Sequence, residues 1–477
     1  MIIGFCAWIF TMVLGFYLIC TAQWYSYKIN RVFFHCAKPV WHIYFALLPF
    51  VVFCFGMYLS PLLAFILAFC YAGLIVYWQL KMATKLVSTS RTTRFFLILG
   101  LVGVFCLMGF KKWYYLAPAM IIALILSYYL SCVVEKYLAK HYVKLAKEKL
   151  EKLKDLKIVL ITASYGKTSI KNYLASLLEN NGVRMSPRSV NTLMGLVADI
   201  NENLDEKTRI YIAEAGARAK GDIKEITELL NPQFVIVGKI GTAHLEYFKN
   251  IETIRATKLE ALGSKALKKV IAHSSTKLES KENCVIFDEK VKNVKANLSG
   301  LSFKLNLNAK DLDIAVPNML GEFNAENIAA AAFVASELGL NEAQIISRIA
   351  ALKNTEHRLS KTQNGGKIII DDGFNGNFEG MSASYELVRE HDGRKVLVTP
   401  GIIEGSKELN AKLSKIINDI FDVVIISSPL NANELKSALR RPQIIELKNK
   451  AELVSVLGEH TKAGDLILFS NDAPAHI

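Results

Sequence analysis

The sequence predicts a region of membrane-spanning α-helices followed by an α/β region, and three observations support this fold class. Residues 1–134 contain nine Lys or Arg and no Asp or Glu, although the whole chain carries a net charge of +14. The same residues hold long uncharged apolar runs, which contribute to a mean hydropathy of +0.27 for the chain. From Lys157 onwards, short β-branched runs alternate with helical stretches, a pattern typical of α/β domains.

The uncharged runs predict five membrane spans, because a bilayer core requires about 20 apolar residues per helix. These runs are Ile2–Tyr25, Val40–Leu80, Phe95–Phe110 and Trp113–Val134. The second run has 41 residues, about twice one span, and Ser60-Pro61 at its middle predicts a tight turn between two helices.

Positive charges lie in alternate loops of this region, which predicts its orientation. The loop after the first span holds three positive residues and the loop after the third span holds four, namely Lys28, Arg31, Lys38, Lys81, Lys85, Arg91 and Arg94. The Ser60-Pro61 turn has no positive residue, and the loop after the fourth span has two. The positive-inside rule therefore places the N-terminus outside and everything after Val134 in the cytoplasm. A cleaved signal peptide is disfavoured, since no A-x-A type site follows a short apolar segment and further spans follow.

Cysteine usage and charge pattern exclude several classes of protein. Seven of the eight Cys lie in the apolar part, and Cys284 is alone in the α/β part. With no C-x-x-C spacing, a disulfide framework or zinc site is not expected. No basic-aromatic pattern indicates a nucleic-acid partner. The Lys-rich segment 135–157 predicts a basic linker helix, with its lysines either near anionic lipid headgroups or simply in solvent.

A strand, loop and helix beginning at Lys157 carry the clearest functional signal. The β-branched run Ile158–Ile161 leads into T-A-S-Y-G-K-T-S at residues 162–169, and a helical stretch follows. Backbone amides at a helix N-terminus favour phosphate, Lys167 can reach the outer phosphates, and the Thr168 hydroxyl can ligate Mg²⁺. The strict P-loop pattern is not met, because Ile161 stands at its first glycine.

The α/β part resembles the Mur ligase family, whose phosphate loop runs G-[TS]-x-G-K-[ST]-T; Ala163 stands where that loop has its first glycine. Further matches follow in the family's order and extend from Lys157 to the C-terminus. The matching segments are Asn191–Leu196 (N-N-x-x-G-x-P, degraded), Ile212–Ala217 (E-[MA]-G-A), Lys239–Glu246 (N-I-G-x-A-H-L-E), Thr257–Glu260 (x-K-x-E), Gly321–Asn327 (G-x-H-N-x-x-N, with Phe323 for the histidine), His357-Arg358, and Asp371–Asn377 (D-S-Y-N-A-N).

The resemblance implies an ATP-dependent ligase that joins a carboxylate to an amine through an acyl phosphate. It also implies a role for each matching residue. ATP would contact Ser164, Gly166, Lys167, Thr168 and Ser169. Two Mg²⁺ ions would be held by Thr168, Glu214, His244 and Lys258. The adenine would contact Asn324 and Asn327, a phosphate Arg358, and the ribose Asp372. Lys167, His244 and Lys258 would be catalytic.

Lys258 corresponds to the lysine that family members carbamylate. A free ammonium beside Mg²⁺ would repel the ion, whereas a carbamate is an anion and a ligand. The alternatives are a solvated helix lysine for Lys258, an exposed acid at a loop for Glu214, and helix N-caps for Asn324 and Asn327.

The predicted domains are the transmembrane region 1–134, the linker 135–157, a P-loop parallel-sheet central ATPase domain 158–353 and a Rossmann-like C-terminal domain 354–477. The central domain is expected to carry helices on both faces of its sheet. Strands of the last domain are predicted at Lys367–Ile370, Val396–Thr399, Val423–Ser427 and Leu466–Phe469.

The resemblance implies peptidoglycan precursor synthesis. The apolar spans and the positive loops predict that the chain lies in the inner (cytoplasmic) membrane, with its catalytic domains in the cytoplasm. The implied substrates are a UDP-muramoyl tripeptide and D-alanyl-D-alanine; membrane lipid and other cell-wall synthesis enzymes are further candidate partners. Membrane spans stand where the family has its UDP-binding domain, so soluble and lipid-linked substrates both stay open. A folylpolyglutamate or cyanophycin type of ligase is disfavoured by the D-x-x-N-x-N turn. A transporter or sensor with a nucleotide switch is disfavoured by the lack of intramembrane acids. Ala163 and Phe323 leave a non-catalytic scaffold open.

Overall fold

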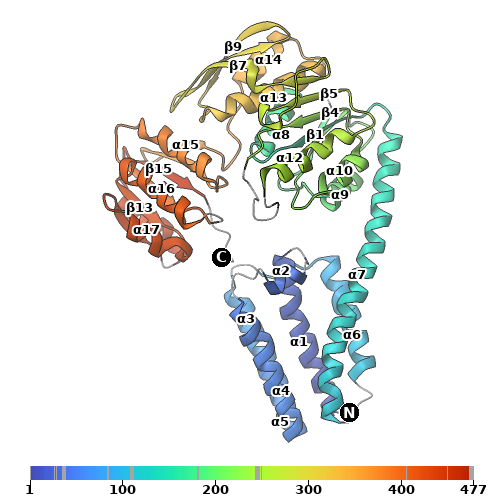
Figure 1. Ribbon diagram of the computed structural model, residues 1–477. Helices are drawn as coiled ribbons and strands as arrows, with labels where there is room; N and C mark the ends of the chain where they lie inside the picture. The colour runs from blue at the N-terminus through green and yellow to red at the C-terminus, as the bar shows by residue number, and fades with distance from the viewer. Residues whose placement is uncertain are drawn as a thin grey trace. The chain divides into compact units, whose positions relative to one another are not determined.

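The computed structural model describes residues 2–25, 27, 29–34, 39–82, 85–107, 112–179, 182–241, 248, 250–403, 406–447 and 449–471. The chain forms two compact units that divide between His141 and Tyr142 (Figure 1). Each unit is described by itself.

The first unit is helical, and five helices among the described residues are long and apolar enough to cross a membrane. This number agrees with the five predicted spans. The helical elements of this unit are α1 (Ile2–Trp24), α2 (Ile29–Phe34), α3 (Val40–His42), α4 (Leu48–Leu59), α5 (Pro61–Lys81), α6 (Ser90–Leu107) and α7 (Trp113–Lys152). One of the five long helices, Val40–Leu59, consists of α3, the π-helical stretch Ile43–Leu47 and α4, and α2 is too short to be among them.

The turn predicted at Ser60-Pro61 is present between α4 and α5. Ser60 has an extended backbone, and its hydroxyl oxygen accepts a hydrogen bond from the Leu63 N–H at 3.1 Å. Pro61 occupies the first helical position of α5, where its missing N–H costs nothing. A serine N-cap followed by proline therefore ends one helix and begins the next.

Helix α1 lies at the centre of the first unit, packed against α5 and α6. Half of its apolar window is buried, compared with 17–28% in the other four long helices. The rings of Trp24, Trp41 and Trp78 cluster with centroids 5.7–6.5 Å apart. These rings come from the helix ends that the charge pattern assigns to the cytoplasmic side, where amphipathic aromatic rings are enriched.

The predicted basic linker is not a separate helix, because α7 continues through Val134 to Lys152 without a break. The last turns of α7 belong to the second unit. Ala146 is fully buried there, and Val143, Leu150 and Leu153 pack beside it. The boundary predicted at residue 134 therefore falls inside a helix. Apolar residues of its last turns pack against the second unit's core, while lysines such as Lys147 face solvent.

The central domain, from β1 to α14, is built on a six-stranded sheet with the order β2-β3-β1-β4-β5-β6, and every pairing in it is parallel. Its strands are β1 (Lys157–Thr162), β2 (Val183–Met185), β3 (Ile210–Glu214), β4 (Phe234–Val237), β5 (Lys269–Ala272) and β6 (Cys284–Ile286). Its helices are α8 (Lys167–Leu177), α9 (Leu193–Asn203), α10 (Asp222–Leu230), α12 (Ile251–Leu259), α13 (Phe323–Glu337) and α14 (Glu342–Ala350).

Helices cover both faces of this sheet, as predicted. Side chains alternate along β1, because successive residues of a strand point to opposite faces. Val159 and Ile161 join the core formed with α8, α13 and α14. Ile158 and Leu160 join the core formed with the end of α7, α9, α10 and α12.

A second sheet in the central domain was not predicted. It is antiparallel and consists of β7 (Val291–Asn297), β8 (Gly300–Leu307) and β9 (Lys310–Pro317). In β8, the buried residues Leu301, Phe303, Leu305 and Leu307 alternate with more exposed ones and face α13.

The C-terminal domain has the sheet order β10-β11-β15-β12-β13-β14, with β10 antiparallel to β11 and the other pairings parallel. Its strands are β10 (Ser360–Asn364), β11 (Lys367–Asp372), β12 (Lys395–Thr399), β13 (Val423–Ile426), β14 (Gln443–Glu446) and β15 (Leu466–Ser470). Its helices are α15 (Phe378–Arg389), α16 (Lys407–Ile420), α17 (Ala432–Ala438) and α18 (Leu453–His460). The four predicted strands agree within two residues at each end.

Candidate active site

The predicted site residues of the central domain gather at one edge of its parallel sheet. Strands β3, β1 and β4 are neighbours, so the residues that follow their carboxyl ends lie side by side. Glu214 ends β3, the loop 163–166 follows β1, and the segment beginning at Gly238 follows β4. Ligands of open parallel sheets bind at this edge.

The loop after β1 has the geometry of a phosphate cradle. Gly166 is the N-cap of α8 with φ 81°, a backbone conformation that favours glycine. A side chain there would also collide with the amide oxygen of Asn327. The Ser164 N–H donates to the Lys239 carbonyl oxygen at 2.9 Å, which fixes the loop against the segment after β4. Asn327 of α13 therefore lies directly against the phosphate loop.

Ala163 replaces the first glycine of the family's loop, and the structure shows how its methyl group fits. Ala163 is fully buried and has no left-handed backbone conformation. A Cβ atom on Gly238 would lie 2.9 Å from the Ala163 Cβ, closer than side-chain carbons approach. The alanine is tolerated because the residue that follows the neighbouring strand β4 is a glycine.

Thr168 and Glu214 were predicted to share a magnesium ion, and they meet in the structure. The Thr168 hydroxyl donates to Glu214 Oε2 at 3.0 Å, and Glu214 is only 3% exposed. Adjacent ligands of an octahedral Mg²⁺ with bonds of about 2.1 Å stand about 3 Å apart. The hydroxyl and carboxylate thus have the oxygen chemistry and the spacing that fit one ion, and Glu214 is not an exposed loop acid.

Two residues that contact Glu214 were not assigned a role by the sequence analysis. The Lys171 ammonium is 1% exposed and lies 3.6 Å from Glu214 Oε2, while donating to the Ser186 carbonyl oxygen at 2.7 Å. The Asn191 amide donates to Glu214 Oε1 at 3.3 Å. Lys171 lies one helical turn after Lys167, a spacing that is visible in the sequence. In the structure its buried ammonium lies beside the Glu214 carboxylate.

Lys167 and Lys258 lie close enough to repel each other. The Lys167 ammonium donates to the Ala163 carbonyl oxygen at 2.8 Å, and burial lowers its pKa. Lys258 is 3% exposed; burial and the nearby Lys167 charge lower its pKa to about 7, against the opposing effect of Asp222. Lys258 is therefore not a solvated helix lysine. Glu260, in the same motif, accepts from the Gly221 N–H at 2.9 Å at the start of α10.

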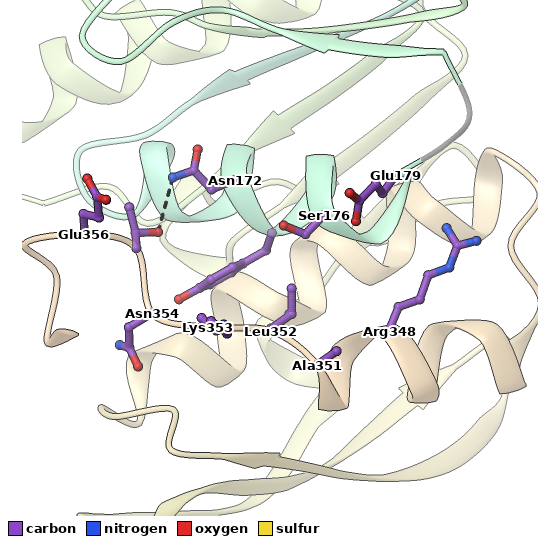
Figure 2. A pocket seen from close by; sticks show the side chains of 11 residues that line it. Asn172, Ser176, Glu179, Arg348, Ala351, Leu352, Lys353, Asn354 and Glu356 are labelled. Atoms are coloured by element: carbon purple, nitrogen blue, oxygen red, sulfur yellow. Dashed lines mark hydrogen bonds between the residues drawn. The ribbon is translucent and has the colours of Figure 1, made fainter. Parts of the chain in front are cut away.

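Asn324 and Asn327 lie inside the first turns of α13, whose N-cap is Glu322, so neither is the predicted alternative, a helix cap. The Tyr173 hydroxyl donates to Asn324 Oδ1 at 3.0 Å. Tyr173 also lines a cavity of about 480 Å³ between α8 and the segment after α14. Figure 2 shows Asn172 and Ser176 of α8 on one side of this cavity and Asn354 on the other, with Asn172 hydrogen-bonded to Thr355.

Arg358 lies between two residues with left-handed backbones, His357 (φ 58°) and Leu359 (φ 54°). Such angles are strained for side chains of this size. Asp372 stabilises the segment by accepting the Leu359 N–H at 3.2 Å, and its other oxygen accepts from Asn375 at 2.9 Å. Asp372 is 1% exposed, and burial raises its pKa to about 7. Its ribose contact remains a prediction, because in this structure both oxygens face the protein.

The remaining predicted residues are placed as follows. Arg358 lies within electrostatic reach of Glu214 and Lys167, and burial lowers its pKa. The Ser164 hydroxyl donates to the Gly241 carbonyl oxygen at 3.2 Å, and Ser169 is buried in the first turn of α8. His244 lies outside the described residues.

Comparison with known proteins agrees with this geometry, since residues 161–335 match the Mur ligase middle domain. This part of the chain is a Mur ligase middle domain. A Mur ligase of Buchnera aphidicola, named UDP-N-acetylmuramoyl-tripeptide--D-alanyl-D-alanine ligase, is 29% identical over 61% of this chain and 70% of its own length. The Bacillus subtilis protein of the same name is 26% identical over 68% of this chain and 75% of its own length.

A solved structure supports the same assignment. The MurF ligase from Thermotoga maritima, crystallised in complex with ADP, has a TM-score of 0.61 and 25% identity, covering 70% of this chain and 80% of that chain. Mur ligases of this type use ATP and Mg²⁺. This site has the groups that ATP and Mg²⁺ require, namely the phosphate loop, the Thr168–Glu214 pair and the surrounding cations.

Proposed function

We propose that this chain is an ATP-dependent ligase of peptidoglycan precursor synthesis that joins D-alanyl-D-alanine to a UDP-N-acetylmuramoyl tripeptide. The observation that carries the proposal is the meeting of Thr168 and Glu214 at 3.0 Å beside a phosphate loop. Relatives named for this reaction match about two thirds of the chain, which supports the choice of substrates.

The proposed reaction has two steps. The tripeptide carboxylate takes the γ-phosphoryl group of ATP, giving an acyl phosphate and ADP; the dipeptide amine then attacks the acyl carbon, phosphate leaves and the amine loses a proton. Because two anions must approach in the first step, fixed cations have to reduce their repulsion. Lys167 and Arg358 serve this purpose in the proposal, and Asn327 and Gly166 shape the phosphate site.

Bound Mg²⁺ would supply charge neutralisation of the phosphates. In the proposal, Thr168 and Glu214 hold one ion, while His244 and Lys258, the lysine as a carbamate, hold a second. The buried position of Lys258 near the Lys167 ammonium supports this role, since a carbamate there would be an anion facing a cation. The cavity beside Tyr173 is the proposed site of the adenine, because Tyr173 is hydrogen-bonded to Asn324.

The first unit is proposed to anchor the enzyme in the cytoplasmic membrane, with the α/β domains in the cytoplasm. Its five long apolar helices and the alternation of positive loops support this location. Membrane lipid is then a partner of the chain. A lipid-linked muramoyl peptide is the alternative acyl donor.

The test is an amine-dependent ATPase assay with the full chain, D-alanyl-D-alanine and UDP-muramoyl tripeptide. ADP formation should require both substrates. Lys167→Ala should reduce the rate roughly 10³-fold or more, because it removes a cation that neutralises transferring phosphate. Lys224→Ala, at an exposed position of α10, is the matched control. Turnover of Lys167→Ala within tenfold of wild type would show that nucleotide does not bind at this loop.

A second arm of the assay replaces the soluble donor by a lipid-linked muramoyl peptide in detergent. Turnover with the lipid-linked donor alone would assign the alternative substrate. ATPase activity that depends on neither donor nor dipeptide would reject the ligase function.

A further inference from the structure

Arg188 reaches from the central domain to the C-terminal domain beside the candidate active site. It lies on the loop after β2, two residues after Ser186, whose carbonyl oxygen binds Lys171. The Arg188 guanidinium carbon lies 4.3 Å from the ring centroid of Phe374, in the turn after β11. The same ring also contacts the His357 ring, with centroids 4.9 Å apart and planes at 80°. Arg188 and the segment carrying Arg358 thus contact one aromatic ring from different domains.

The charge of Arg188 is poorly compensated within the described part of the chain. Its recorded ion pair joins Nη1 to Glu356 Oε2 at 3.8 Å, and the two side chains are 49% and 86% exposed. An ion pair so long and so exposed contributes little. Arg188 is also near enough to Arg358 to lower the pKa of that guanidinium, in addition to the larger effect of burial.

Stacking on Phe374 leaves the chemically useful part of Arg188 free. A guanidinium that lies over an aromatic face uses its plane for the contact, so its N–H groups still point outward along the edge. Two guanidinium groups near one another, one stacked and one held on a strained segment, offer the paired donors that bind carboxylate or phosphate oxygens in a bidentate manner. The other charged groups near Arg358 are the carboxylates of Asp372 and Glu214 and the ammonium of Lys167.

We propose that Arg188 is a substrate-binding residue that acts with Arg358 as a two-arginine clamp for an oxyanion. The proposal rests on the ligase function proposed above. The ligand chemistry is a phosphate of the nucleotide or the free carboxylate of the dipeptide acceptor, because both are oxyanions brought to this site during the reaction.

The experiment compares wild type with Arg188→Ala and Arg188→Lys in the full chain. Arg209→Ala is the matched control, since Arg209 is 60% exposed, pairs with an exposed carboxylate at 3.5 Å, and precedes β3 at the opposite edge of the sheet. Calorimetry measures the binding of ADP and, with ADP bound, of D-alanyl-D-alanine; kinetics gives KM for ATP, for the dipeptide and for its C-terminal amide.

A clamp on nucleotide phosphate predicts that Arg188→Ala weakens ADP binding roughly ten- to hundredfold, the effect of losing a charge-assisted hydrogen bond. A clamp on the dipeptide carboxylate predicts the same loss for D-alanyl-D-alanine, and the wild-type preference for the acid over the amide should disappear in the variant. Arg188→Lys should recover only part of the affinity, because lysine keeps the charge but not the planar paired donors.

The proposal is overturned if Arg188→Ala changes the binding of both ligands less than twofold, or if Arg209→Ala causes equal losses. It is also overturned if Arg188→Lys shows the same loss as alanine together with a lowered melting temperature, since that pattern indicates a structural role. Absence of turnover in wild type would reject the ligase function while the ADP measurement still decides whether Arg188 binds phosphate.

Discussion

The surroundings of Lys258 suit its proposed conversion to a carbamate. It is 3% exposed and faces both Lys167 and Glu214. If it works as a carbamate, Lys258→Ala deletes a charge and a ligand, and activity should fall by at least about 10³-fold. Formate or acetate should then restore part of the activity by occupying the vacated space. The measurement is the amine-dependent ATPase rate with and without the added acid.

Lys258→Arg provides the control, because a guanidinium keeps its positive charge and cannot take up CO₂ in this way. This variant should stay inactive with or without formate, and removal of bicarbonate should slow only the wild type. A fully active arginine variant would mean that the lysine is merely a cation.

Asp372 should give the stability of the protein a distinctive pH dependence. Burial raises its pKa to about 7 from an ordinary value of 3.8, so the folded chain holds this proton over a range where the unfolded chain has lost it. The contribution of Asp372 to the free energy of unfolding is fully present below about pH 4. It is lost as the pH rises through about 7, and the loss is a few kcal/mol at most.

Asp372→Asn removes this dependence. The difference in melting temperature, variant minus wild type, should therefore be larger at pH 8 than at pH 5. The measurement is thermal unfolding of the full chain in detergent. A difference between the two proteins that does not vary with pH would show that Asp372 is ionised throughout.

At the scale of residues, the motifs predicted a contact between two side chains that are proposed to bind Mg²⁺. Thr168 and Glu214 were paired by resemblance and meet in the structure. Lys171 was missed because a lysine in an amphipathic helix gives no sign of burial until its partners, far apart in sequence, are known. The effect of Phe323 was equally hidden: its ring packs beside Gly321 and Leu359, and it joins the apolar cluster of the C-terminal domain.

At the scale of elements, the ends of β1 and β4 are fitted to each other. Gly238→Ala would place a Cβ 2.9 Å from that of Ala163, so the strand ends would have to separate. Overpacking of this kind costs about 1–3 kcal/mol. The variant should have a lower melting temperature and weaker ADP binding than wild type.

The double variant Ala163→Gly/Gly238→Ala should recover most of that loss, because the colliding methyl group is removed. Ala163→Gly alone should cost about 1 kcal/mol or less. Strictly additive effects of the two substitutions on melting temperature would contradict the proposed contact, since residues in contact give non-additive changes.

Strand β1 and four strands of the C-terminal domain could be predicted from their β-branched runs, whereas the parallel strands β2, β5, β6 and β14 were not predicted individually. The antiparallel sheet β7-β8-β9 was missed, although Leu301, Phe303, Leu305 and Leu307 alternate with polar residues as in a half-buried strand. No motif drew attention to this segment. The extent of α7 could not be predicted either, because a lysine-rich stretch with leucines fits a helix on lipid, in water or against protein, and only its packing partners distinguish these.

At the scale of the whole molecule, the charge pattern predicts a topology. A reporter fused after Val134 should be cytoplasmic, and one at the N-terminus should lie outside. The measurement is reporter activity in intact cells, with external protease as a second probe. Digestion of residues 158–477 by protease added outside intact cells would end the cytoplasmic assignment.

The path of α7 has a practical consequence for anyone preparing the catalytic part for solution work. A chain shortened to begin at Lys157, where the motifs begin, would uncover the surface on which Val143, Ala146, Leu150 and Leu153 pack. Exposed apolar surface of this kind promotes aggregation. A chain beginning at Tyr142 would keep that helix in place, including the bond from Lys149 to the Asn201 carbonyl oxygen. We therefore expect the soluble yield of the α/β part to depend on residues that belong, in sequence, to the long helix α7.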